Sequence, residues 1–97
     1  MTIKNICILG AGTLGSRVAL QAAISGYQVS IYDIEQKSLD LSLVTMQKIL
    51  RQLFKSGQLL ETQGPEILNR IKFTLDPVEA VRDAYFINEC VTEEPDI

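Results

Sequence analysis

The sequence of 97 residues predicts a single α/β domain, in which short strands alternate with helices around a parallel sheet. Three observations lead to this prediction. An apolar run over residues 4–9 ends at a G-x-G-x-x-G motif, residues 10–15, and helical spacing begins directly afterwards. A second run, residues 28–32, alternates apolar and polar side chains and ends on Asp33. Two further short strands each follow a helical segment, as right-handed crossovers between parallel strands require.

Each glycine of the motif has a physical role in a strand-turn-helix unit. Gly10 lets the chain reverse, Gly12 lets the backbone approach a pyrophosphate, and Gly15 lets the helix lie close to the strand. The unpaired N–H groups at the helix start, together with the helix dipole, then form an anion site. The motif therefore predicts a Rossmann-type doubly wound sheet that binds a dinucleotide. The residues predicted to contact its pyrophosphate are Gly10, Ala11, Gly12, Thr13, Leu14 and Gly15.

Asp33 lies about 20 residues beyond the motif, at the end of the next strand, where the dinucleotide fingerprint places an acidic residue. Its carboxylate can accept hydrogen bonds from a ribose 2′-hydroxyl and would repel a 2′-phosphate. The nearest cation, Lys37, follows a turn further on. We therefore expect NAD, in preference to NADP, as the cofactor.

Two helices follow the first two strands. The first is predicted over residues 12–25, ending at Gly26. Leu14, Val18 and Ala22 share one face of it, and its small alanines are expected to meet the sheet. The second is a long amphipathic helix over residues 36–55 that ends at Gly57 and covers one face of the sheet. Its apolar stripe consists of Leu39, Leu43, Met46, Leu50 and Leu53.

The second half of the chain predicts two more strand and helix pairs. A connector over residues 59–64 leads into a short helical turn with Pro65 at its first position. A strand over 71–74, a short helix over 76–82 and a strand over 85–89 complete the chain. The expected strand order is 3-2-1-4, with helices on both faces of the sheet. That order brings the ends of strands one, two and four, at Gly10, Asp33 and Glu89, to one edge, where ligands bind.

Composition excludes several classes of function. The net charge is −3 and the basic residues are scattered, which argues against a nucleic-acid partner. The N-terminal apolar stretch is too short to span a membrane or act as a signal peptide, so a cytoplasmic location is the expectation. Cys7 and Cys90 have no metal-binding spacing and are expected to be reduced thiols. No metal site is predicted, and no catalytic residue either, since the chain contains no histidine.

The sequence resembles the NAD-binding domain of the 3-hydroxyacyl-CoA dehydrogenase family over nearly its whole length. The glycine motif and Asp33 carry part of the resemblance, but they occur in many families. More specific are Ser56-Gly57-Gln58-Leu59 after the long helix, Arg70-Ile71-Lys72-Phe73-Thr74, Ala80-Val81-Arg82-Asp83-Ala84 and Asn88-Glu89-Cys90-Val91-Thr92-Glu93.

The resemblance implies that the pyrophosphate lies over residues 10–15, the adenosine ribose at Asp33, and that Glu93 lies in a loop that meets the cofactor. It places the family's catalytic histidine, with its glutamate partner, beyond Ile97. Residues 1–97 would then be the N-terminal part of a Rossmann domain, whose remainder and C-terminal helical domain lie outside the chain. Some members contact coenzyme A through a serine and a lysine on the long helix, where this sequence has Ile49 and Ser56. Relatives that act on carnitine or on sugar acids share the same N-terminal pattern.

Three hypotheses about function follow. The first is the nucleotide-binding part of a dehydrogenase in fatty acid metabolism, most simply one that oxidises a 3-hydroxyacyl-CoA with NAD, the 97-residue chain alone being inactive. The second is a stand-alone NAD-binding module without catalysis. The third is a flavoprotein or another Rossmann protein, which is less favoured because the long helix and the segment from Glu89 to Glu93 match the hydroxyacyl pattern better. We expect the parent to be a homo-oligomer, and the chain to self-associate through the apolar edge of its fourth strand.

Overall fold

The computed structural model describes residues 4–82 and 84–89, which form four strands and five helical segments. The strands are β1 (Asn5–Leu9), β2 (Gln28–Tyr32), β3 (Ile71–Thr74) and β4 (Phe86–Glu89). The helical segments are α1 (Thr13–Ile24), α2 (Gln36–Lys55), the 3₁₀ turn η1 (Glu61–Gln63), α3 (Gly64–Asn69) and α4 (Pro77–Val81). The elements lie within a residue or two of the segments predicted from the sequence. The exceptions are η1, which lies within the predicted connector, and α3, a helix of 6 residues where the sequence indicated only a helical turn.

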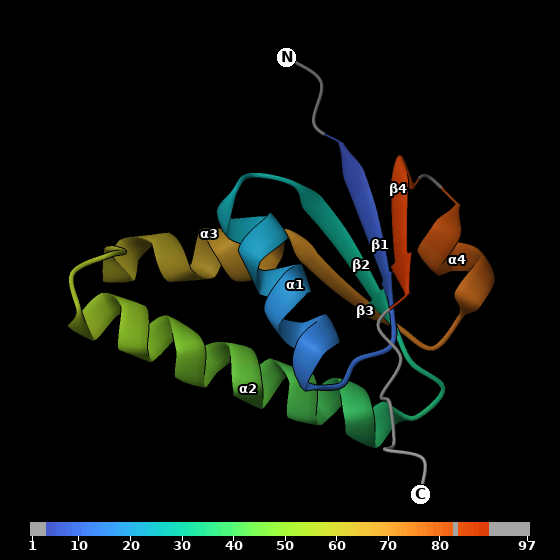
Figure 1. Cartoon of the computed structure of the whole chain (residues 1–97), viewed down its shortest axis with the longest axis horizontal. Coiled ribbons are helices and arrows are strands. Elements are labelled where there is room, and N and C mark those ends of the chain that lie inside the picture. The colour runs from blue at the N-terminus through green and yellow to red at the C-terminus, as the bar shows by residue number, and fades with distance from the viewer. Residues whose placement is uncertain (1–3, 83, 90–97) are drawn as a thin grey trace, which may run out of the picture.

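The four strands form one parallel sheet in the order β3-β2-β1-β4, which confirms the predicted fold and strand order (Figure 1). β1 is central, and its last residue, Leu9, lies beside Tyr32 of β2 and Glu89 of β4. Tyr32 in turn lies beside Thr74 of β3. The carboxyl ends of all four strands therefore meet at one edge of the sheet.

The helices lie on both faces of the sheet because the chain changes direction across it. The connections from β1 to β2 and from β2 to β3 both move toward the β3 edge of the sheet. Right-handed crossovers in that direction place α1 and α2 on one face. The connection from β3 to β4 returns across the whole sheet, so the same handedness places α4 on the opposite face. Contacts agree with this layering, since α1 packs on α2 while α4 packs on β1, β2 and β3.

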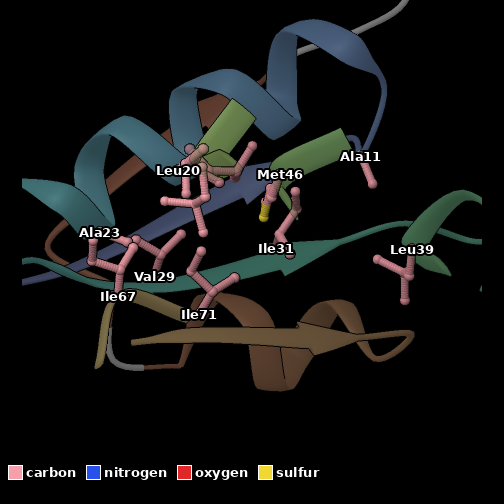
Figure 2. Close-up of a cluster of buried hydrophobic side chains, with 12 residues drawn as sticks. Ala11, Leu20, Ala23, Val29, Ile31, Leu39, Met46, Ile67 and Ile71 are labelled. Atoms are coloured by element: carbon pink, nitrogen blue, oxygen red, sulfur yellow. The ribbon is translucent and has the colours of Figure 1, made fainter. Parts of the chain in front are cut away.

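The main hydrophobic core lies between the sheet and the α1–α2 layer (Figure 2). Alternate strand residues point into it, and side chains from three helices cover them. Its strand members are Ile8, Val29, Ile31 and Ile71, and its helical members include Ala19, Leu20, Ala23, Leu39, Met46, Leu50 and Ile67. The apolar stripe predicted for residues 36–55 is therefore the buried face of α2, although Leu43 and Leu53 are only half-buried.

The buried side of α1 is the side with small residues, which the sequence predicted to meet the sheet. Gly15, Ala19 and Ala23 are buried against the sheet, whereas Leu14 is 61% exposed and Val18 is half-buried. The reason is steric: the side that approaches the strands most closely is the side with the smallest side chains, and these recur every four residues from Gly15. On the other apolar face, Val18 and Ala22 are partly buried and pack against the core, and Leu14 is exposed.

Two glycines end the long helices as expected. Gly26 and Gly57 have φ values of +100° and +80°, which residues with a Cβ rarely adopt. The residue after each then bonds back to the preceding helix: the Tyr27 N–H to the Ala22 carbonyl and the Gln58 N–H to the Leu53 carbonyl, at 3.0 Å in both cases.

Candidate dinucleotide site

The glycine motif forms the turn between β1 and α1. Gly10 has a φ of +111°, so only glycine adopts this turn without strain. Its N–H donates to the Tyr32 carbonyl at 2.8 Å, which continues the β1–β2 ladder one residue past the strand. The turn is thus anchored to the end of β2 before α1 begins.

The start of α1 is suited to an anion. Gly12 is the N-cap residue and has no side chain, so no side chain caps the helix, and no acidic residue lies in its first turn. The first amides of a helix have no partner within the helix, and the dipole of a 12-residue helix adds partial positive charge there. A pyrophosphate that approaches along the loop can accept hydrogen bonds from these amides.

Asp33 lies directly after β2 and holds the glycine turn from the side. Its Oδ2 accepts the N–H of Ala11 at 3.0 Å, and its Oδ1 accepts the N–H of Glu35 at 3.1 Å. A carboxylate offers about four acceptor positions, so two positions remain for the hydroxyl groups of a ribose. The side chain predicted to bind the ribose therefore also fixes the loop that binds the pyrophosphate.

The sheet register brings the predicted edge residues together. Gly10 and Asp33 follow the paired residues Leu9 and Tyr32, and Glu89 is paired with Leu9 on the other side. The predicted juxtaposition of these three positions at the carboxyl edge is confirmed. Glu93, the remaining predicted cofactor residue, lies outside the described residues.

Two buried serines near the turn were not recognised from the sequence. Ser16, in the first turn of α1, and Ser42, in α2, are each 1% exposed. Their Oγ atoms lie 2.6 Å apart, and the Ser16 Oγ also lies 2.8 Å from the Gly12 carbonyl oxygen. Neither residue belongs to a motif. The only signal was a polar residue directly after Gly15 and another three residues after Leu39 in an apolar stripe.

In the described part of the chain, the other titratable groups do not form a metal site. Cys7 is a buried thiol on β1, and burial raises its pKa, so it stays protonated at neutral pH. Among the described residues, no three His, Cys, Asp or Glu side chains gather in a way that could hold a metal ion. No described helix is long and apolar enough to cross a membrane.

A polar hollow of about 360 Å³ lies far from this edge, at the amino ends of the strands. Arg70 and Lys72 line it, but Glu66 and Glu79 respectively pair with them. Arg82 also lines the hollow. Because ligands of parallel sheets of this kind bind outside the carboxyl ends of the strands, the carboxyl edge remains the site that the geometry supports.

A parallel sheet with a glycine turn, an uncapped helix start and an acidic residue at the end of β2 defines a dinucleotide-binding domain of the Rossmann class. A model of the family described as "3-hydroxyacyl-CoA dehydrogenase, NAD binding domain" matches residues 5–97. The chain belongs to this family, and NAD is its cofactor.

Individual relatives agree with this assignment. A probable 3-hydroxybutyryl-CoA dehydrogenase of Bacillus subtilis is 31% identical over 93 residues, which are 96% of this chain and 32% of that protein. A fatty acid oxidation complex subunit alpha of Idiomarina loihiensis is 35% identical over 95 residues, which are 98% of this chain and 13% of that protein. The crystal structure of (S)-3-hydroxybutyryl-CoA dehydrogenase from Ralstonia eutropha matches with a TM-score of 0.87 at 28% identity, over 96% of this chain and 32% of that one. The chain thus spans a third or less of the length of these relatives.

Proposed function

We propose that the chain is the cofactor-binding part of an enzyme that oxidises the hydroxyl group of a 3-hydroxyacyl-CoA to the 3-oxo form, with hydride transfer to NAD. The observation that carries the proposal is the glycine turn held by Asp33 at the carboxyl edge of the sheet, in a chain of this family. Relatives named as 3-hydroxybutyryl-CoA dehydrogenases support the substrate class. Bound NAD supplies the hydride acceptor.

The described residues bind and orient the cofactor. The amides at the start of α1 receive the pyrophosphate, and Asp33 accepts hydrogen bonds from the ribose hydroxyls. Glu93 stays a predicted contact to the cofactor. The 97 residues include no histidine, so a histidine base for the hydroxyl proton comes from outside them. The chain alone is accordingly proposed to bind NAD without turnover.

The cofactor is tested by titrating the chain with NAD and with NADP in a calorimeter. We expect NADP to bind at least about tenfold more weakly, because the Asp33 carboxylate repels its 2′-phosphate. Tighter binding of NADP would overturn the assignment of the ribose site.

A hydroxy acid without coenzyme A is the second candidate for the substrate. Ile49 packs partly buried against the core, and the Ser56 hydroxyl donates to the Leu53 carbonyl at the end of α2. These are the positions at which the resemblance placed a serine and a lysine that contact coenzyme A. The protein encoded at the locus, given NAD and either 3-hydroxybutyryl-CoA, carnitine or a sugar acid, distinguishes the candidates by NADH formation. Turnover of carnitine or the sugar acid alone would refute the acyl-CoA assignment.

Two properties of the longer protein stay predictions from the sequence: a cytoplasmic location and a homo-oligomeric state. Fractionation of the source cells tests the first, and the mass of the purified protein in solution tests the second.

A further inference from the structure

The hydroxyl groups of Ser16 and Ser42 form a hydrogen-bond chain with a defined direction. The Ser16 Oγ has three oxygen neighbours: the Gly12 carbonyl at 2.8 Å, the Ala11 carbonyl at 3.3 Å and the Ser42 Oγ at 2.6 Å. The Gly12 carbonyl is the closer carbonyl acceptor for the single Ser16 proton. With that proton on the Gly12 carbonyl, Ser42 is the donor to Ser16. The chain runs from α2 through α1 to the glycine turn.

This hydrogen-bond chain acts on the same peptide segment as Asp33, from another direction. Asp33 holds the Ala11 N–H from the end of β2, and Ser16 contacts the Ala11 and Gly12 carbonyls from within α1. The carbonyls of the turn and the amides that face the ligand belong to the same rigid peptide planes. Fixing the carbonyls therefore fixes the direction of the amides.

Burial makes the arrangement sensitive to substitution. Both serines are 1% exposed, so no water can replace a lost partner without opening the contact between α1 and α2. A serine in a helix often bonds the carbonyl four residues back, and Ser16 does this with Gly12. That common bond does not explain the contact with the second helix, in which Ser42 of α2 meets Ser16 from 26 residues further along the chain.

We propose that Ser16 and Ser42 are positioning residues for the dinucleotide: they hold the glycine turn in its binding geometry without contacting the ligand, and so raise the affinity for NAD. Binding is stronger when the site is already ordered before the ligand arrives. Ser16 acts directly on the turn, and Ser42 acts through Ser16. The inference rests on this edge being the NAD site.

The test compares NAD affinity with stability in Ser16→Ala, Ser42→Ala, the double variant and a control. The control is Ile67→Val, a buried substitution in α3 at the opposite end of the core from Ala11 (Figure 2). Urea unfolding measures stability, and calorimetry measures the dissociation constant for NAD under conditions in which every variant is folded. The control shows whether a general loss of stability weakens binding.

We expect Ser16→Ala to weaken NAD binding about tenfold and Ser42→Ala about threefold. The double variant is expected to bind no more weakly than Ser16→Ala, since Ser42 acts through Ser16. Ile67→Val should lower the urea midpoint and leave the dissociation constant unchanged. Unchanged affinity in both single serine variants, or a similar loss of affinity in Ile67→Val, would overturn the proposal.

If Ser16→Ala does not fold, Ser42→Ala and the control decide the question alone. If the unmodified chain does not bind NAD at all, the cofactor site itself is wrong, which is a different result from equal binding by all variants.

Discussion

At the scale of the residue, Asp33 holds the glycine turn and is the predicted contact to the ribose. It accepts the N–H of Ala11 and keeps acceptor positions for a ribose, so one carboxylate couples the shape of the loop to the choice of cofactor. Its backbone N–H donates to the Thr74 carbonyl at 3.4 Å, which ties the same residue to the end of β3.

Asp33→Ala should weaken NAD binding by about tenfold or more, because a hydrogen bond to a charged group contributes about 1.5–3 kcal/mol. Calorimetry measures the dissociation constant. The matched control is Glu35→Ala, which removes an exposed carboxylate two residues away that has no part in the loop contact. Equal losses of affinity in the two variants would show that only the local negative charge matters.

Because the Cys7 thiol is buried, we predict that the free energy of unfolding depends on pH. Burial raises the pKa of its thiol, so the folded state holds this proton more tightly than the unfolded state, whose thiol titrates at about 8.5. The contribution is complete below that pH and is lost as the pH rises through the folded pKa. The free energy of unfolding, from urea titrations, should therefore fall more steeply in alkaline solution for the parent than for Cys7→Ala. Parallel curves for the two proteins would contradict the burial of this thiol.

At the scale of the element, α4 depends on a cap. A helix of 5 residues is far below the length that is stable alone, yet it is the only described helix on its face of the sheet. Its N-cap Asp76 accepts the N–H groups of Val78 and Glu79 at 2.9 and 3.3 Å, and Pro77 occupies the first helical position.

Asp76→Ala should lower the free energy of unfolding by about 1 kcal/mol, the usual effect of losing a carboxylate cap. Urea unfolding measures it. Asp40→Ala serves as the control: it removes an exposed carboxylate whose bond is to Gln36 on the surface of α2, and it should change stability by less than about 0.5 kcal/mol. A neutral Asp76→Ala would mean that packing of Ala80, and not the cap, holds α4 in place.

At the scale of the whole molecule, the β4 edge of the sheet exposes apolar side chains. β4 is the outer strand on one side of the described sheet, and three consecutive large apolar side chains there are exposed: Tyr85 at 69%, Phe86 at 55% and Ile87 at 48%. A short apolar edge without lysine or proline readily pairs with another strand. Lys4 lies over the Tyr85 ring at 4.1 Å and covers it only partly.

We therefore predict that the 97-residue chain self-associates through β4 and that Ile87→Lys reduces the association. Light scattering at several concentrations measures the mean mass. Leu60→Lys is the matched control, because Leu60 is also exposed, at 69%, but lies in the connector after α2. A monomeric parent, or equal loss of association in the two variants, would rule out the β4 edge as the cause.

The sequence by itself determined the main elements, their order and the edge of the sheet at which the ligand is predicted to bind. Short apolar runs, helical stripes and glycine stops are local patterns, and the right-handed crossover rule converts their order into the sheet β3-β2-β1-β4. Gly10 and Asp33 could be assigned for the same reason: each directly follows a strand, so its position at the carboxyl edge depends only on the topology.

Only the tertiary structure decided how exposed the other face of α1 is and how the glycine turn is held. The sequence placed the small alanines of α1 toward the sheet, and Ala19 and Ala23 are buried there, but the exposure of Leu14 depends on how the helices pack. The contact between Ser16 and Ser42 depends on the packing of two helices whose residues are 26 positions apart. No local pattern encodes such a contact, because it exists only once α1 and α2 lie against each other.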